Sequence, residues 1–155
     1  MYGKILLPVE NIESAGLAIS NAKQIVGSGC AEVILFHVVS PETPPVMLHD
    51  HIGGVQAAAE LFEVAQCAEA KNVEDQTAII QITAEELSSA GLSVSSQVVV
   101  GKASVEIVRA VLEQEIDLVI ISTRGRRGVS RAFLGSVADE VMRDVDIPVM
   151  VVRRS

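Results

Sequence analysis

Tryptophan is absent from the sequence, and aromatic residues make up only 3% of its 155 residues. Proteins that bind single-stranded nucleic acid stack the bases on aromatic side chains, so this composition argues against such a binder. The net charge of −8 argues further against a general nucleic-acid binder and against a protein that binds anionic membranes. We therefore expect no nucleic-acid partner and no membrane partner.

Long apolar runs and clustered cysteines are also missing. No apolar run approaches about 18 residues, so the sequence predicts no membrane-spanning helix. The two cysteines, Cys30 and Cys67, lie far apart without metal-ligand spacing, which suits a reducing compartment. We expect both to be small buried side chains. The first residues show no basic region followed by an apolar stretch and a cleavage site, so we expect a cytoplasmic protein.

A regular alternation of apolar runs and helical patterns fills the chain instead. Short runs typical of buried strands occupy residues 4–9, 32–39, 92–100, 118–122 and 149–152. Helical spacing occupies residues 12–26, 55–89, 104–114 and 136–143. Strands that alternate with helices predict a parallel sheet. We therefore expect a three-layer α/β fold, with a five-stranded parallel sheet between helices, as a single domain over residues 1–155.

Some helix details can also be predicted. Asn11 and Ser104 are polar residues at helix starts, and we expect them to be N-caps. Residues 55–89 contain no proline or glycine, and their pattern fits one long helix or a bent one. The apolar face of this helix is predicted to run through Leu61, Val64, Ala68, Val73, Ala78, Ile82 and Leu87. The proline-rich start of residues 40–54 predicts a surface loop.

Residues 118–137 carry the clearest indication of a binding site. An apolar strand leads into a glycine-bearing loop that ends at Gly135 and Ser136, where a helical pattern begins. Such a junction aims backbone N–H groups at a phosphate. Four arginines of this stretch would pair with phosphate oxygens, namely Arg124, Arg126, Arg127 and Arg131. The alternatives are that Gly125 only forms a turn, that Ser136 only caps a helix, and that the arginines face solvent or acidic neighbours.

A ligand of such a sheet binds beyond the carboxyl ends of the strands, where the winding direction reverses. The residues predicted there are 8–11, 38–40, 100–102 and 121–127. Glu10 could accept hydrogen bonds from ribose hydroxyls or from a base amino group, or it could be a solvated acid. The Walker pattern GxxxxGK[ST] is absent, so the chain has no P-loop lysine for phosphoryl transfer.

The histidines do not indicate a catalytic or metal centre. His49 and His51 lie close together, but two histidines without a third ligand make a poor metal site, and we expect no metal. His37, inside an apolar strand, is expected to be a core histidine with a satisfied hydrogen bond. No Ser–His–Asp grouping or nucleophile elbow is recognisable. We expect at most slow ATP hydrolysis or autophosphorylation.

These motifs together resemble the universal stress protein family along essentially the whole chain. Nucleotide-binding members of that family carry Gly-x-x-Gly, nine residues, and then Gly-Ser or Gly-Thr. Here Gly125, residues 126–134 and Gly135-Ser136 follow that pattern. Residues 146–153 are similar to the closing strand of the family, and residues 4–9 and 32–38 to its first two strands.

Three positions differ from the pattern of the nucleotide-binding members. Ser122 stands where they carry the first glycine of the motif, and Glu10 stands where they carry an aspartate. Gly101-Lys102-Ala103 replaces the common Gly-x-Pro. The resemblance therefore leaves the phosphate half of the site intact and alters the nucleoside half.

The resemblance implies a Rossmann-like fold of the adenine nucleotide alpha hydrolase type. It implies a regulatory or stress-protective protein that binds ATP, AMP or another adenine nucleotide, alone or with Mg²⁺. The nucleoside would lie among Pro8, Val9, Glu10, Val38, Ile121 and Ser122. The phosphates would lie along Arg124, Gly125, Gly135, Ser136, Val137 and Ala138. The resemblance also implies a homodimer through the C-terminal strand 149–153, and the alternative is a dimeric interaction module that binds no nucleotide.

Overall fold

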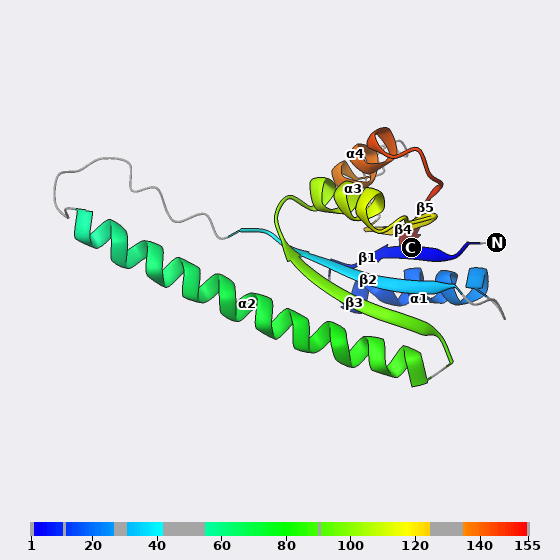
Figure 1. The fold of residues 1–155 in the computed structure, drawn as a ribbon, viewed down its shortest axis with the longest axis horizontal. Helices are drawn as coiled ribbons and strands as arrows, with labels where there is room; N and C mark the ends of the chain where they lie inside the picture. The colour runs from blue at the N-terminus through cyan, green and yellow to red at the C-terminus, as the bar shows by residue number, and fades with distance from the viewer. Residues whose placement is uncertain are drawn as a thin grey trace.

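The computed structural model of the chain describes residues 2–10, 12–26, 31–41, 55–89, 91–124 and 135–154. Strands and helices alternate along the chain as predicted (Figure 1). The elements are β1 (Lys4–Pro8), α1 (Ile12–Val26), β2 (Glu32–Val39), α2 (Val55–Ser89), β3 (Ser93–Val100), α3 (Ala103–Glu113), β4 (Leu118–Arg124), α4 (Ser136–Asp144) and β5 (Val149–Arg154). None of these helices, as far as their residues are described, combines the length and apolar character of a membrane span.

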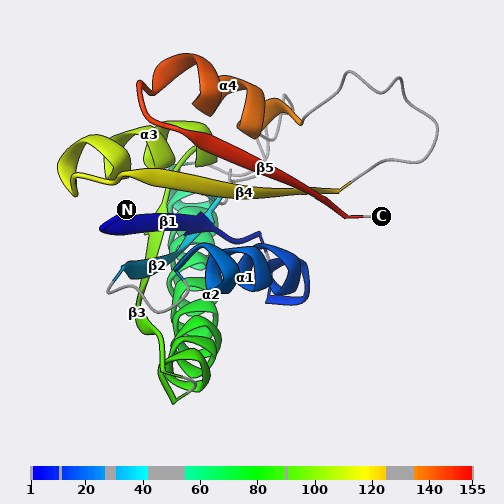
Figure 2. The same ribbon diagram turned by 90° about the vertical axis from the view of Figure 1, so that its right-hand side faces the viewer.

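The five strands form one parallel sheet in the order β3-β2-β1-β4-β5. The chain winds outward from β1 through β2 to β3, and then returns to the other side of β1 to add β4 and β5. The winding direction therefore reverses between β1 and β4. One face of the sheet is covered by α1 and α2 and the other by α3 and α4 (Figures 1 and 2). This three-layer arrangement confirms the predicted α/β fold.

The central strand β1 is apolar at successive positions because both faces of the sheet are covered. Ile5 and Leu7 pack toward α1 and α2, whereas Leu6 packs toward α3 and α4. Successive side chains of a strand point to opposite faces, so a strand covered on both sides needs an apolar residue at each position. All three side chains are 0% exposed.

The long helix α2 is continuous over 35 residues, but its predicted apolar face is wrong. Val64 is 67% exposed and Ile82 is 58% exposed. Among the residues of α2 whose burial is described, the buried ones are Ile80, Ala84 and Leu87, and the sequence predicts only Leu87. A helix of this length spans about 52 Å, whereas an eight-residue strand spans about 26 Å. Only the C-terminal part of α2 can therefore lie along the sheet, and Figure 1 shows its N-terminal end beyond the carboxyl ends of the strands.

Two further expectations about single side chains are wrong. Cys67, expected to be buried, is exposed on α2. Ser104 is not an N-cap, because α3 begins one residue earlier with Lys102 in the N-cap position and no side-chain capping bond. Ser104 is instead buried, and its hydroxyl donates to Glu140 of α4. The predictions for Asn11, Cys30 and residues 42–54, including His49 and His51, lie outside the described residues.

The last two strands are each two residues longer than predicted. β4 continues through Thr123 to Arg124, and β5 continues to Arg154. Thr123 pairs in register with Arg153, and Arg124 with Arg154. The ladder is made by backbone groups, so it can continue after the apolar side chains end. The extension carries β4 to the start of the predicted binding loop.

At the amino edge of the sheet, Asp117 ties β4 to β1. Its Oδ2 accepts the N–H of Gly3 at 2.8 Å and the N–H of Lys4 at 2.9 Å. Its own N–H donates to the carbonyl of Lys4 at 2.9 Å. The hydrogen bonds from Lys4 and then from Gly3 favour the carboxylate and hold the pKa of Asp117 below its ordinary value.

We expect Asp117→Asn to lower the free energy of unfolding at pH 7, because a neutral amide accepts these two N–H groups less strongly. The lowered pKa makes this stabilisation complete above the ordinary aspartate pKa of about 3.9, and it is lost as the pH falls through the lowered value. The gap between wild type and variant should therefore narrow as the solution is acidified below about pH 4. Urea unfolding at several pH values measures it.

The exposed Asp146, in the loop before β5, provides a matched control. Asp146→Asn should have a small effect at every pH. A gap for Asp117→Asn that stays constant as the solution is acidified would contradict the assigned role of the carboxylate.

Candidate functional site

The carboxyl edge of the sheet, where the winding reverses between β1 and β4, is where a fold of this kind offers a crevice. The ladder between β1 and β4 pairs Leu6 with Val119, so Pro8 and Ile121 lie two residues nearer to this edge. Ser122 follows on β4 and is half-buried, and Val38 lies near the end of the neighbouring β2. The fold thus brings predicted nucleoside residues together from three adjacent strands.

The turn that follows β1 is held by β2. The N–H of Val9 donates to the carbonyl of Phe36 at 2.8 Å, and Nδ1 of His37 lies 2.7 Å from the carbonyl oxygen of Val9. A carbonyl only accepts, so Nδ1 carries the hydrogen and the imidazole donates. His37 has the hydrogen bond that the sequence predicts, but its side chain is half-buried and not in the core as expected. This bond fixes the backbone directly before Glu10, which is exposed.

Sequence reasoning did not place His37 at the site. The register of the sheet pairs Pro8 with Phe36, which puts His37 level with Val9. That register comes from the tertiary fold, and no local signal in the sequence could have supplied it.

The N-terminus of α4 lies beside the end of β4. Gly135 is the N-cap residue with φ 97° and ψ 141°, a backbone conformation that strongly favours glycine. A Cβ at Gly135 would lie 3.8 Å from the methyl group of Thr123, which brings the helix start to the end of the strand. The alternative that Ser136 caps this helix is wrong, because Ser136 is the first helical residue and is exposed.

The first turn of α4 can bind an anion. The first backbone bond of this helix runs from the N–H of Asp139 to the carbonyl of Gly135 at 3.0 Å. The N–H groups of Ser136, Val137 and Ala138 precede it, and N–H groups in these positions point out of the helix end. Together with the helix dipole they favour negative charge. Ala138 is 1% exposed, so it also anchors the turn in the core.

Part of the predicted phosphate site lies outside the described residues. Arg124 ends β4, and its backbone pairs in register with Arg154. Gly125 and the other loop arginines, Arg126, Arg127 and Arg131, lie beyond the described part of β4. The assignments to Arg124 and Gly125 therefore remain predictions.

A buried hydroxyl and a lysine attach α4 to α3. Oε2 of Glu140 accepts the Nζ of Lys102 at 2.6 Å and the Oγ of Ser104 at 2.5 Å. The hydrogen bond from Lys102, followed by that from Ser104, holds the pKa of Glu140 below its ordinary value. An ion pair between Asp139 and Arg143 lies within α4 itself. These contacts fix the position of the helix whose N-terminus faces the carboxyl edge.

The loop before α3 is held close to β2. The N–H of Gly101 donates to the carbonyl of Val39 at 3.0 Å. A Cβ at Gly101 would come within 2.7 Å of the Glu106 side chain, which is 7% exposed and pairs with Arg109. Glycine is therefore required at position 101, because the Glu106 side chain lies close to its backbone. The following Lys102 supplies the contact to α4.

The arrangement is suited to binding an anion. It combines helix N–H groups, the half-buried hydroxyl residues Ser122 and Thr123, and the exposed carboxylate of Glu10 along one edge. Among the residues whose positions are described, no three His, Cys, Asp or Glu side chains are grouped as a metal site.

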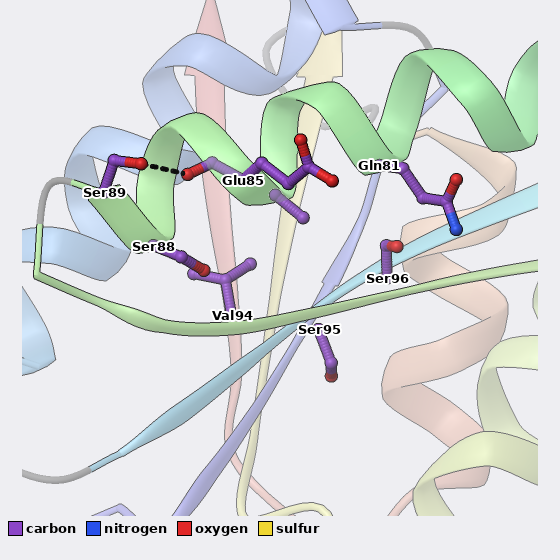
Figure 3. Close-up of a pocket in the computed structure, with 8 residues that line it drawn as sticks. Gln81, Glu85, Ser88, Ser89, Val94, Ser95 and Ser96 are labelled. Atoms are coloured by element: carbon purple, nitrogen blue, oxygen red, sulfur yellow. Dashed lines mark hydrogen bonds between the residues drawn. The ribbon is translucent and has the colours of Figure 1, made fainter.

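A separate hollow of about 550 Å³ lies between the C-terminal part of α2 and β3 (Figure 3). It is open to solvent, and Ser89 on its rim donates to the carbonyl of Glu85 at 2.9 Å. The residues that line it are Gln81, Ala84, Glu85, Ser88, Ser89, Val94, Ser95 and Ser96. The three strand residues lie in the first half of β3, away from the carboxyl edge, so this hollow does not coincide with the predicted site.

Known proteins with similar sequences cover the whole chain. A sequence model of the universal stress protein family matches residues 1–153. Universal stress protein MJ0577 of Methanocaldococcus jannaschii is 30% identical over 160 positions, which cover 99% of this chain and 96% of the relative. The solved structure of MJ0577 superposes with a TM-score of 0.77 at 27% identity and covers 100% of this chain and 98% of that one.

Two other solved structures share the fold at lower identity. A universal stress protein in complex with cAMP has a TM-score of 0.58 at 21% identity, covering 99% of this chain and 98% of that one. A universal stress protein family protein from Arabidopsis thaliana, with AMP bound, has a TM-score of 0.60 at 14% identity, covering 99% of this chain and 92% of that one. At these identities the likeness shows the fold alone.

Two glycine-to-alanine variants should change stability in opposite directions. Gly135→Ala forces a side chain into a conformation that costs about 1–3 kcal/mol, so the variant should unfold more easily. Gly16 lies inside α1, and a Cβ there would meet nothing within 4 Å. Gly16→Ala should therefore stabilise the protein by about 0.5–1 kcal/mol. Urea unfolding of both variants tests the assigned helix start, and equal effects would contradict it.

Proposed function

Because this chain belongs to the universal stress protein family, we propose that it binds an adenine nucleotide at the carboxyl edge of its sheet, in a regulatory or stress-protective role. The observation that carries the proposal is the position of the α4 N-terminus beside the end of β4, at the side of β1 where the winding reverses. This position supports the proposal, because N–H groups at a helix start beside a strand end favour a phosphate.

The ligand would lie across the edge in two halves. The nucleoside half is assigned to Pro8, Val9, Glu10, Val38, Ile121 and Ser122. The phosphate half is assigned to Arg124, Gly125, Gly135, Ser136, Val137 and Ala138. The carboxylate of Glu10 is exposed and can accept hydroxyl or amino hydrogens, and the helix N–H groups and Arg124 can pair with phosphate oxygens.

The relatives support adenine as the base. One structure of the same fold holds cAMP and another holds AMP. ATP is assigned as a further candidate ligand. Mg²⁺ would enter with the phosphates of ATP, because this ion is commonly held by substrate phosphates and one or two carboxylates.

We further propose that the chain works in the cytoplasm as a single-domain protein and that it forms a homodimer. Since β5 is an edge strand of the sheet, it can pair with a second copy through residues 149–153. Met150 on this strand is 38% exposed, and a strand edge with apolar side chains favours pairing.

The second candidate is an interaction module of the same fold that binds no nucleotide. The observations that favour it are Ser122, whose side chain is half-buried where a glycine would leave room for a nucleoside, and Glu10, which is one methylene longer than an aspartate. A Cβ and a longer carboxylate at these positions would narrow the nucleoside half of the site.

Two measurements test the leading proposal. The protein is denatured and analysed for released nucleotide, and ATP, ADP and AMP are then titrated calorimetrically into the stripped protein. Ser136→Ala should weaken binding about 10- to 100-fold, since a hydrogen bond from the hydroxyl to a charged phosphate oxygen contributes about 1.5–3 kcal/mol. Arg124→Glu should weaken it about 10- to 100-fold, since bonds to charged groups contribute about 1.5–3 kcal/mol. Unchanged affinity in both variants would remove the phosphate assignment.

Two matched controls accompany these variants. Ser93→Ala changes an exposed serine at the amino end of β3, and Lys23→Glu makes the same charge change as Arg124→Glu on the exposed surface of α1. Both controls should bind nucleotide like the wild type.

The double variant Glu10→Asp with Ser122→Gly separates the two candidate functions. If the wild type already binds, the double variant should bind with similar or higher affinity, because it widens the nucleoside half. Binding that is absent in the wild type and gained only in the double variant would instead establish the interaction module.

A further inference from the structure

The outward surface of α2 carries a regular series of residues that the proposed nucleotide site does not use. The series is Val64, Ala68, Lys71, Asp75, Ala78 and Ile82, and every member is exposed. The steps between neighbours alternate between four and three residues. Such steps mark residues on one face of an α-helix, and paired helices use the same spacing, so we call these six residues the α2 seam.

The seam faces away from the body of the protein. Ile80 and Leu87, which anchor α2 in the core, are seven residues apart and lie on the opposite side of the helix from the seam. Val64 is 67% exposed and Ile82 is 58% exposed, so the two branched apolar ends of the seam are open to solvent. The N-terminal end of the helix also extends past the strand ends (Figure 1).

The order of residues in the seam is symmetric about its centre. Branched apolar residues lie at the two ends, alanines lie inside them, and one basic and one acidic residue occupy the middle. Two copies of such a seam, related by a twofold axis, are complementary when the helices run antiparallel. Val64 then faces Ile82 of the partner subunit, and Ala68 faces Ala78 of the partner subunit.

The two central charges select this orientation. In the antiparallel pair Lys71 faces Asp75 of the partner subunit, and the twofold axis repeats this contact. In a parallel pair Lys71 would face Lys71 of the partner subunit, and Asp75 would face its own copy, which is repulsive. Lys71 is the only basic residue in the sequence of α2, so these two contacts are the opposite-charge contacts that the antiparallel seam can make.

We infer that two copies of this chain associate through their α2 seams as an antiparallel helix pair. The contact spans about 27 Å from Val64 to Ile82. Ile79, which is 44% exposed, flanks the seam and adds apolar surface near Ala65 of the partner subunit. The association is concentration-dependent and weak, because small alanines and exposed charges fill most of the seam. It involves neither the carboxyl edge nor β5.

A charge-exchange cycle tests the pairing. Lys71→Asp and Asp75→Lys each turn both central contacts into like-charge contacts, whereas the double variant Lys71→Asp/Asp75→Lys restores opposite charges in exchanged positions. Each single variant should raise the concentration of half-association about tenfold, and the double variant should return it to within about threefold of the wild type. Sedimentation equilibrium of the full chain over a wide concentration range measures this.

The cycle stays decisive if the protein also pairs through β5. All four proteins share the same β5 edge, so only the association step made by α2 differs among them. Lys71 and Asp75 are exposed, and circular dichroism verifies that each variant is folded. Equal association of all four proteins, or a double variant as weak as the singles, would overturn the inference.

Cysteine cross-linking tests the orientation separately, in a Cys67→Ser background. A mixture of Ala68→Cys and Ala78→Cys proteins should form disulfide-linked heterodimers under mild oxidation. Ala68→Cys alone should cross-link much less, because two copies of position 68 are separated by about 15 Å along an antiparallel pair. Cross-linking of Ala68→Cys alone as readily as the mixture would overturn the antiparallel arrangement.

Discussion

The side chains of Ile5, Leu6 and Leu7 leave β1 in opposite directions, and all three are withdrawn from water. Such burial requires a layer of helices on each face of the sheet, and parallel strands require a long crossover between neighbours. Helices that serve as crossovers on both faces force the chain to wind in two directions from β1. The reversal of the winding between β1 and β4, and the helix N-terminus beside the end of β4, follow from this requirement.

The sequence predicts the fold well because burial of the strands on both faces produces local patterns of apolar residues. Apolar runs such as residues 4–9 cannot belong to a half-solvated strand, and helical spacing between them leaves few topologies. The failures concern tertiary contacts. Ser104 looks like a helix cap, but Glu140 of α4 provides a stronger partner for its hydroxyl. Val64 and Ile82 look like core residues, but they lie on the side of α2 opposite Ile80 and Leu87, which pack in the core.

For the candidate site, too, the sequence predicts some residues and misses the tertiary contacts that hold them. Gly135 and Ser136 could be located from glycine spacing, because a helix start beside a strand end needs a residue that tolerates the turn. The hydrogen bond from His37 to the Val9 carbonyl and the anchoring of α4 by Lys102 could not be located from sequence. These contacts join segments that only the sheet register and the packing of α3 on α4 bring together. Local patterns therefore predict which groups form the edge of the site, and tertiary contacts determine how rigidly they are held.

The position of α2 in the fold also bears on how large an assembly this chain can build. α2 packs against β3 and β2 at one end of the strand order, whereas β5 lies at the other end, so the two surfaces can be occupied at the same time. Each would relate two copies by its own twofold axis. Axes that intersect at right angles close after four copies, and axes that do not intersect continue as an open filament. The position and the angle at which α2 crosses the sheet thus together separate a closed particle from a fibre.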